Sequence, residues 1–163
     1  MKLYFSVILG FLSLLQQPVS QSQGEIDENN IVTEVDQDLI VKLVNEFRSS
    51  GIKSYTCESE TPEPLVWNEE LAHVASIHCM DMYRNNFSGH FGSDGSDPGE
   101  RLQKLGYRYN ASGENVGMGN FTESKVISAW MQSPGHRKNI MNVRFHRIGV
   151  ARVGNYWTML LSN

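Results

Sequence analysis

The chain has 163 residues, with 14 Lys and Arg against 18 Asp and Glu, so its formal net charge is −4. This acidic balance argues against nucleic acid or an anionic membrane as the main partner. The length fits one domain, which can bury about two thirds of its unfolded surface and form a core without covalent staples.

The N-terminus resembles a secretory signal peptide. Lys2 supplies a positive charge, and Leu3 to Leu15 is almost wholly apolar. Small residues at Ser20 and Ser22 then suit a cleavage site. The apolar run is too short to cross a bilayer, which needs roughly 20 residues. We therefore predict a signal peptide over residues 1–22, a secreted, extracellular protein and no transmembrane segment; an N-terminal anchor helix is the alternative.

An acidic stretch precedes the first predicted helix. From Gln21 to Asp38 the chain carries six acidic residues and no Lys or Arg, and large apolar side chains are few in its first half. Such a composition favours disorder, which we predict for residues 23–34. The segment from Val35 to Ser49 then places apolar residues at helical spacing, and Gly51 is a natural stop.

A second helix is predicted to begin after Asn68. Asparagine is a favoured N-cap, and Glu69 and Glu70 fall in the first turn, where the helix dipole favours acidic side chains. The predicted inward face of this helix carries Leu71, Ala75, His78, Cys79 and Met82.

The chain has two cysteines, Cys57 in the loop between the first two helices and Cys79 on the second. In an oxidising compartment they predict one disulfide, which on the chain-entropy model stabilises the fold by roughly 3 kcal/mol. Their spacing excludes a CxxC redox motif or a zinc ribbon. Two unpaired buried thiols are the alternative.

The remaining elements alternate between helices and strands. Patterning predicts a long loop over Asn85–Gly99, a short helix over Gly99–Leu105 and a strand over Gly113–Met118. A third main helix opens at Thr122, and a turn follows over His136–Met141. Two strands end the pattern, over His146–Val153 and Tyr156–Leu161. Gly154-Asn155 is a two-residue hairpin signal between the last two strands. Helices before and between antiparallel strands predict an α+β layered domain.

Three sequons predict N-glycosylation sites in segments that also read as loops. Their acceptor residues are Asn86, Asn110 and Asn120. Glycosylation follows only if the host is eukaryotic, which leaves all three as expectations.

Several short segments, taken in order, resemble a known family. They are Leu65-Val-Trp-Asn-Glu-Glu-Leu-Ala, Phe87-Ser-Gly-His, Glu100-Arg-Leu with Gly106-Tyr, Gly113-Glu-Asn, Trp130-Met-Gln-Ser-Pro-Gly-His-Arg-Lys-Asn-Ile, Phe145-His-Arg-Ile-Gly-Val and Tyr156-Trp-Thr. Their order and spacing are similar to those of the CAP superfamily, which comprises cysteine-rich secretory proteins, antigen 5 and pathogenesis-related proteins and is defined by the SCP domain. The likeness covers about Val35 to Leu161 and is closest to the minimal branch common in bacteria.

The resemblance implies both a fold and a site. The fold would be an α-β-α sandwich over residues 35–163, with helices on both faces of a small antiparallel sheet. The site would be a cleft in which His90, Glu114 and His136 match three members of a tetrad that can bind a divalent metal, zinc or magnesium. The position of the second acid holds Ser133, so the tetrad is incomplete.

The chemistry of these residues leaves alternatives open. Two imidazoles and a carboxylate can form an open zinc site that activates water. Equally, His90 can be a solvated loop residue, His136 a hydrogen-bonded helix-end histidine, and Glu114 a strand carboxylate paired with a neighbour. Glu100-Arg101 and Arg137–Asn139 are predicted to form a packing network beside the cleft.

Three functions are compatible with the sequence. The first is a secreted, non-enzymatic binding or interaction module, whose partner is a sterol, a fatty acid or an extracellular protein. The second is a metal-dependent hydrolase or endopeptidase that uses His90, Glu114 and His136. The third is a structural extracellular protein with a vestigial cleft. No Gly-x-Ser-x-Gly nucleophile elbow occurs in the sequence.

Overall fold

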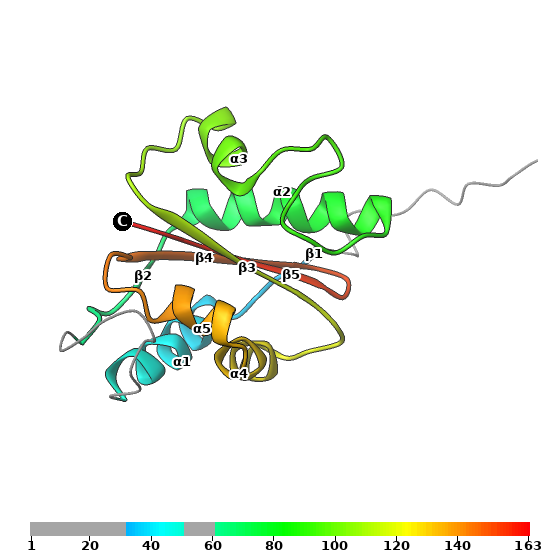
Figure 1. Ribbon diagram of the computed structural model, residues 1–163. Coiled ribbons are helices and arrows are strands. Elements are labelled where there is room, and N and C mark those ends of the chain that lie inside the picture. Colours follow the sequence, from blue (N-terminus) through cyan, green and yellow to red (C-terminus); the bar gives the residue numbers. More distant parts are fainter. Residues whose placement is uncertain (1–31, 51–60) are drawn as a thin grey trace, which may run out of the picture.

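The computed structural model describes residues 32–50 and 61–163, and in them five helices enclose one sheet (Figure 1). Helices α2 and α3 cover one face of the sheet, and α1, α4 and α5 cover the other. The helices are α1 (Gln37–Ser49), α2 (Glu69–Asn85), α3 (Pro98–Lys104), α4 (Glu123–Gln132) and α5 (Pro134–Ile140). The predicted α-β-α sandwich is therefore confirmed.

The sheet is antiparallel along its main path. Its strands are β1 (Val32–Thr33), β2 (Val66–Trp67), β3 (Ser112–Met118), β4 (Arg147–Val153) and β5 (Tyr156–Ser162). The order is β1-β4-β5-β3, and β2 pairs in parallel with the start of β4. Strand β3 therefore forms one edge of the sheet, beside the central β5.

Local capping chemistry explains where the main helices begin. The side chain of Asp36 accepts a hydrogen bond from Leu39 N at 2.9 Å, which caps α1. Asn68 caps α2 in the same way through Leu71 N, at 2.8 Å, as predicted. Each cap satisfies one of the backbone N–H groups that the first helical turn leaves without a partner.

Two expectations about local structure need correction. The segment predicted as a turn before Met141 is helix α5, because Pro134 at its first position has a backbone angle already suited to a helix. Val32–Thr33, the end of the segment predicted as disordered, forms β1 by pairing with Arg152 and Val153 of β4. Residues 1–31, with the predicted signal peptide, lie outside the described residues.

Alternation along β5 gives the sheet two separate cores. Trp157, Met159 and Leu161 pack with α1, α4 and α5. Tyr156 and Leu160 point the other way and pack with α2 and α3. Successive side chains of a strand point to opposite faces, so a central strand with helices on both sides must be apolar almost throughout. All seven residues of β5 are buried.

Buried Arg48 connects α1 to the end of α5. Its guanidinium group, 1% exposed, donates hydrogen bonds to the backbone carbonyls of Glu63, Ile140, Asn142 and Phe145. Burial lowers the pKa of Arg48 to about 10, which leaves it charged at neutral pH. The carbonyl oxygens replace the water that burial removed, as a buried cation requires.

No disulfide is seen in the described part of the chain, and the Cys57–Cys79 pairing stays a prediction. Cys79 is a free, buried thiol on the inner side of α2, where it contacts Thr158 Oγ1 at 3.2 Å and the Ala151 carbonyl at 3.4 Å. Its sulfur therefore faces the sheet, in the core between α2, β4 and β5, as in the alternative of buried thiols. Cys57 lies outside the described residues.

Gly149 sets the distance between α2 and the sheet. A Cβ added there would overlap Ala72 N and lie 2.5 Å from the backbone carbon of Leu71. We expect Gly149→Ala to lower the free energy of unfolding by about 3 kcal/mol, because the overpacked helix must move away from β4. Urea denaturation measures this change.

Gly135→Ala is the matched control for this substitution, because a Cβ at Gly135 meets nothing within 4 Å. In the first turn of α5 the added methyl group costs no packing and should leave stability unchanged or slightly higher. Equal effects of the two substitutions would contradict the close approach of α2 to the sheet.

The state of Cys79 has a direct chemical test. Burial raises the pKa of its thiol to about 12, so we expect no alkylation of Cys79 by iodoacetamide in the native protein at neutral pH. In urea without reductant, Cys79 should be fully alkylated, which peptide mass mapping detects. Protection that persists in urea until a reductant is added would show a disulfide instead.

Candidate functional site

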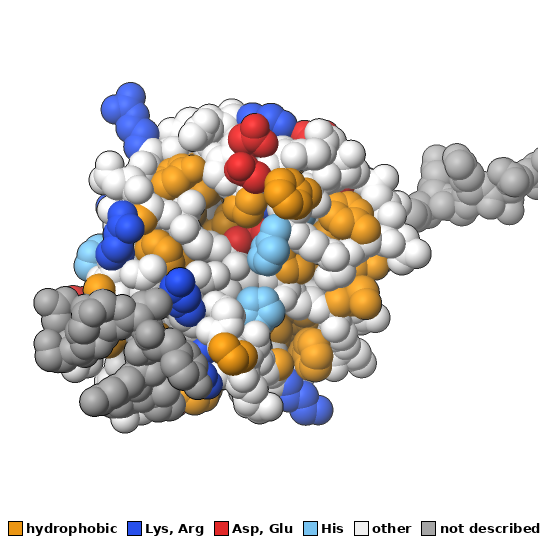
Figure 2. Space-filling model, viewed as in Figure 1, with side chains coloured by type: hydrophobic (Ala, Val, Ile, Leu, Met, Phe, Trp, Pro, Cys, Tyr) orange, Lys and Arg blue, Asp and Glu red, His pale blue; other side chains and the backbone are white. Residues whose placement is uncertain are grey.

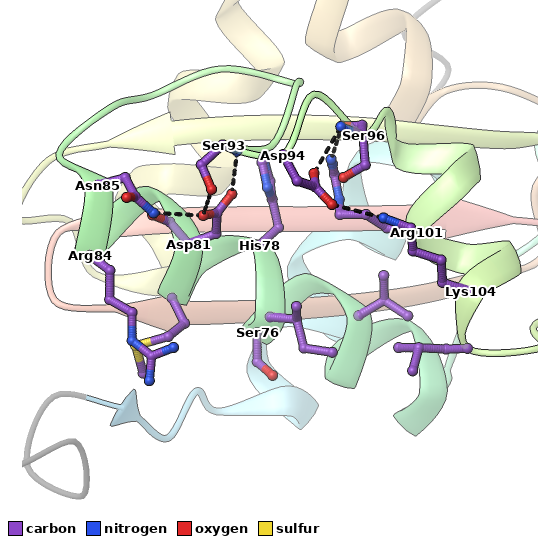
Figure 3. Close-up of a pocket in the computed structure, with 14 residues that line it drawn as sticks. Ser76, His78, Asp81, Arg84, Asn85, Ser93, Asp94, Ser96, Arg101 and Lys104 are labelled. Atoms are coloured by element: carbon purple, nitrogen blue, oxygen red, sulfur yellow. Dashed lines mark hydrogen bonds and ion pairs between the residues drawn. The ribbon is translucent and has the colours of Figure 1, made fainter.

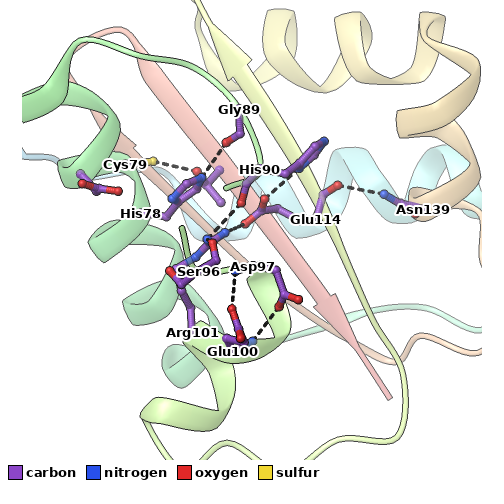
Figure 4. Close-up of polar contacts among 12 residues, drawn as sticks. His78, Cys79, Gly89, His90, Ser96, Asp97, Glu100, Arg101, Glu114 and Asn139 are labelled. Atoms are coloured by element: carbon purple, nitrogen blue, oxygen red, sulfur yellow. Dashed lines mark hydrogen bonds and ion pairs between the residues drawn. The ribbon is translucent and has the colours of Figure 1, made fainter. Parts of the chain in front are cut away.

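The predicted site lies on the face of the molecule that carries the β3 edge. In Figure 2 two histidine side chains are exposed near the centre of this face, and an acidic side chain lies beside one of them. A separate cavity lies along α2, lined by residues that include His78 and Arg101 (Figure 3). The contacts that build the predicted site are drawn in Figure 4.

A buried carboxylate, Glu114, lies at the centre of the site. Its side chain is only 2% exposed and projects from β3 toward α3 (Figure 4). Its Oε2 pairs with Arg101 at 2.7 Å, and its Oε1 accepts a hydrogen bond from His90 Nδ1 at 2.9 Å. Both carboxylate oxygens therefore have a charged or polar partner, as a buried acid requires.

Arg101 holds the loop before α3 against the site. Besides Glu114, its guanidinium group donates to the backbone carbonyls of His90, at 3.0 Å, and Ser96, at 2.8 Å. Its position depends on the start of α3, where Asp97 and Glu100 form a reciprocal capping box. Of the two residues predicted to pack beside the cleft, Glu100 therefore caps α3 and Arg101 forms a buried ion pair with Glu114.

The ring of His90 is oriented by Glu114 and half exposed. Its side chain is 51% exposed, and its Nδ1 points at the carboxylate, so Nδ1 carries a proton and donates. The hydrogen bond to Glu114 and the negative charge of Glu114 raise the pKa of His90, against a smaller opposing effect of burial. The carboxylate of Glu114 thus fixes the orientation of the His90 ring through Nδ1, and Nε2 is not part of this hydrogen bond.

The opposite side of β3 positions His136. Because side chains alternate along a strand, Asn115 faces α5, where its Nδ2 donates to the His136 carbonyl at 3.1 Å. Asn139 of α5 in turn donates to the Glu114 carbonyl and to Asn115 Oδ1, each at 2.9 Å. These bonds dock the first turn of α5 on the edge strand.

His136 lies within electrostatic range of His90. Burial lowers the pKa of His136, and the positive charge of His90 lowers it further. The pKa values of the two imidazoles therefore shift in opposite directions, upward for His90 and downward for His136. No hydrogen bond joins His136 to Glu114 in the described part of the chain, so the three predicted residues form one bonded pair and a neighbour.

The described residues do not form a ready metal cage. In them no group of three or more His, Cys, Asp and Glu side chains is placed to hold a metal ion. Both oxygens of Glu114 accept hydrogen bonds instead, from Arg101 and from His90. Ser133, where the family has its second acid, is the N-cap of α5. Metal binding by His90, Glu114 and His136 stays a prediction.

Sequence reasoning missed the part played by Asn115. The signal was present, because Asn115 directly follows Glu114 in a predicted strand and must face the other layer. The three sequon asparagines lie apart from the site: Asn86 is the left-handed cap of α2, Asn110 is exposed, and Asn120 accepts a bond from Arg152. Glycosylation stays a prediction.

Sequence comparison identifies the family. A profile of the Cysteine-rich secretory protein family, CAP, matches residues 41–159. The chain belongs to the CAP family. An uncharacterized protein of Bacillus subtilis, YkwD, is 31% identical to the chain over 152 residues, which is 88% of this chain and 55% of YkwD. The chain thus spans about half the length of this curated relative.

Solved structures with the same fold come from extracellular or surface proteins. An extracellular protein of Bacillus anthracis that contains an SCP domain matches with a TM-score of 0.69 and 28% identity, over 77% of this chain and 39% of that one. An outer surface protein of Borrelia burgdorferi matches with a TM-score of 0.67 over 81% of this chain and 96% of that one, and at 19% identity shows the fold alone. In the described part of this CAP chain, no helix has the length and apolarity needed to span a bilayer.

The opposite pKa shifts of the two histidines can be measured. In an NMR titration of the imidazole carbons, we expect His90 to titrate above 6.5 and His136 below 6.5. Since folding raises the pKa of His90, its stabilisation is complete below pH 6.5 and is lost as the pH rises through the folded value. Glu114→Gln should lower the pKa of His90.

Glu70→Gln is the control for this titration, because Glu70 is an exposed acid in the first turn of α2 and takes no part in the site. It should leave the titration of His90 unchanged. A pKa of His90 that does not respond to Glu114→Gln would contradict the assigned hydrogen bond.

Proposed function

We propose that this CAP protein is a secreted, non-enzymatic binding module, and that the cleft around His90, Glu114 and His136 is its recognition site. The observation that carries the proposal is the engagement of Glu114, whose two oxygens each accept a hydrogen bond, one from Arg101 and one from His90. A carboxylate so engaged orients the neighbouring ring, and Arg101 and His90 compete with any metal ion for the electron density of its oxygens.

The contacts of the imidazoles also favour binding. Among the described residues, the ring of His90 is bonded to Glu114, and no Ser, Thr or Cys side chain is hydrogen-bonded to His90 or His136. Nucleophilic catalysis depends on such contact between a nucleophile and its base. The buried thiol of Cys79 is directed to Thr158, away from the cleft.

The exposed groups of the cleft favour a ligand with a carboxylate. The raised pKa of His90 favours the protonated form of a ring that is half exposed, and Phe91 beside it is 67% exposed. A carboxylate can accept from a protonated imidazole while an apolar chain covers the phenyl ring. Both a fatty acid and an acidic segment of an extracellular protein carry this combination, whereas a sterol offers only a hydroxyl group.

A metal-dependent hydrolase is the second candidate, because the two imidazoles and Glu114 do lie at one edge of the sheet. Zinc needs three protein ligands with an open position for water. Here His90 and His136 would be the nitrogen ligands and Glu114 the oxygen ligand. A bound zinc ion would supply an activated water; the protein residues would hold and orient it.

One pair of variants separates the two functions. We expect sodium decanoate to shift the imidazole resonances of His90 in the wild type, and the double variant His90→Ala/His136→Ala to bind it about tenfold more weakly, because the charged hydrogen bond is lost. Hydrolysis of a peptide library with added zinc should be the same for both proteins. Titration calorimetry and mass spectrometry provide the two readouts.

The double variant His73→Ala/His146→Ala is the matched control, since both histidines are exposed and neither belongs to the site. It should bind decanoate like the wild type. Zinc-dependent peptide hydrolysis that disappears only in the cleft variant would overturn the binding proposal in favour of the hydrolase. Decanoate binding that is indifferent to the cleft histidines would also refute it.

A further inference from the structure

A buried residue of α2, His78, contacts the loop that carries His90. His78 is 0% exposed, and its ring meets the ring of Phe87 edge to face, with the centroids 6.2 Å apart. Its Nε2 lies 2.8 Å from the carbonyl oxygen of Gly89, the residue directly before His90 (Figure 4). The ring therefore contacts this loop at two positions, both close to His90.

The chemistry of the two groups gives the direction of this hydrogen bond. A carbonyl oxygen can only accept, so Nε2 of His78 carries the proton and donates to Gly89. Burial lowers the pKa of His78, which favours the neutral ring with a single proton, and Nδ1 has no hydrogen-bond partner in the described structure. The ring of His78 is therefore a donor dedicated to the loop.

Two consecutive carbonyl groups of the loop are held from two different helices. His78 of α2 donates to the Gly89 carbonyl, and Arg101 of α3 donates to the His90 carbonyl at 3.0 Å. The first carbonyl belongs to the peptide plane before the Cα of His90, and the second belongs to the plane after it. Because each peptide unit is planar, two held planes determine φ and ψ of His90 and hence the direction in which its side chain leaves the backbone.

The side-chain contact of His90 with Glu114 depends on this backbone. The two side chains meet at 2.9 Å, but the ring of His90 is half exposed. A polar contact of an exposed side chain contributes little when its backbone is free to move, because ordering the group costs conformational entropy. The hydrogen bond from His78 fixes the backbone and so lowers that cost.

We propose that His78 is a positioning residue of the cleft, whose hydrogen bond to the Gly89 carbonyl places His90 and the exposed Phe91 for ligand binding. The inference rests on the recognition role proposed for the cleft. His78 acts through the backbone of the loop and not by contact with the ligand. Arg101 shares this task but also pairs with Glu114, so only His78 can be changed without leaving the buried carboxylate unpaired.

The wild-type protein provides the first test. At about pH 8.5, above the usual pKa of histidine, a long-range ¹H–¹⁵N spectrum of the ¹⁵N-labelled full chain shows which nitrogen of each neutral ring carries the proton. We expect the proton of His78 on Nε2 and the proton of His90 on Nδ1. A proton of His78 on Nδ1 would remove the donor to Gly89 and overturn the proposal.

Two variants of His78 then separate the donor from the bulk of the side chain. His78→Leu removes the donor and keeps a buried apolar group. We expect the proton of His90 to be no longer confined to Nδ1 in this variant, and sodium decanoate to bind about fivefold more weakly. His78→Gln keeps an N–H donor at a similar reach and should restore both the His90 spectrum and the affinity.

Cys79→Ala is the matched control for these variants. Cys79 is the next residue of α2 and is equally buried, but its sulfur contacts Thr158 of the sheet. The truncation should lower stability in urea without changing the His90 spectrum or the decanoate affinity. Urea denaturation of all three variants shows that folded proteins are being compared.

Three results with the variants would overturn the proposal. An unchanged His90 spectrum in His78→Leu would show that Glu114 alone orients the ring. The same spectral change in Cys79→Ala would show a general loosening of α2, and no recovery in His78→Gln would show that the donor is not what holds the loop. A wild type that does not bind decanoate would instead refute the proposed function, and the His90 spectrum would still decide the role of His78.

Discussion

The carboxylate of Glu114 is the constraint on which the site depends. A charged group that is 2% exposed must be paired, and the partner comes from α3 as the guanidinium group of Arg101. This pairing draws α3 and the loop that carries His90 and Ser96 onto the edge strand. The same carboxylate then orients the ring of His90, so one buried charge positions a helix, a loop and an exposed imidazole.

The edge strand β3 joins the two helical layers at the site. Glu114 faces α3, while Asn115 faces α5 and reaches the backbone of His136. Two backbone carbonyls of this edge, those of Glu114 and Val116, accept hydrogen bonds from the Asn139 and Trp130 side chains. These bonds position α5 and also occupy acceptors that an edge strand would otherwise leave open to another chain.

Sequence patterns predicted best where the cause is local. The caps at Asn68 and Thr122 were predicted, because a side chain three residues away satisfies the helix end. Strands β1 and β2 were missed, since two residues carry no period and exist only by pairing with β4. The Cys57–Cys79 pairing was predicted from the oxidising compartment and from the presence of two cysteines. Neither fact tells which way the side chain of Cys79 points. The sulfur of Cys79 in fact faces Thr158.

The sequence by itself determined the family and the layered fold, and it predicted the three residues of the candidate site. Periodicity and capping depend on neighbours in the chain, and the order of the seven quoted motifs is typical of one family. Only the tertiary structure decided how those residues are used. One oxygen of Glu114 accepts from Arg101 and the other from His90, whereas no hydrogen bond joins His136 to Glu114 within the described chain. These contacts depend on the long-range packing that brings β3, α3 and α5 together.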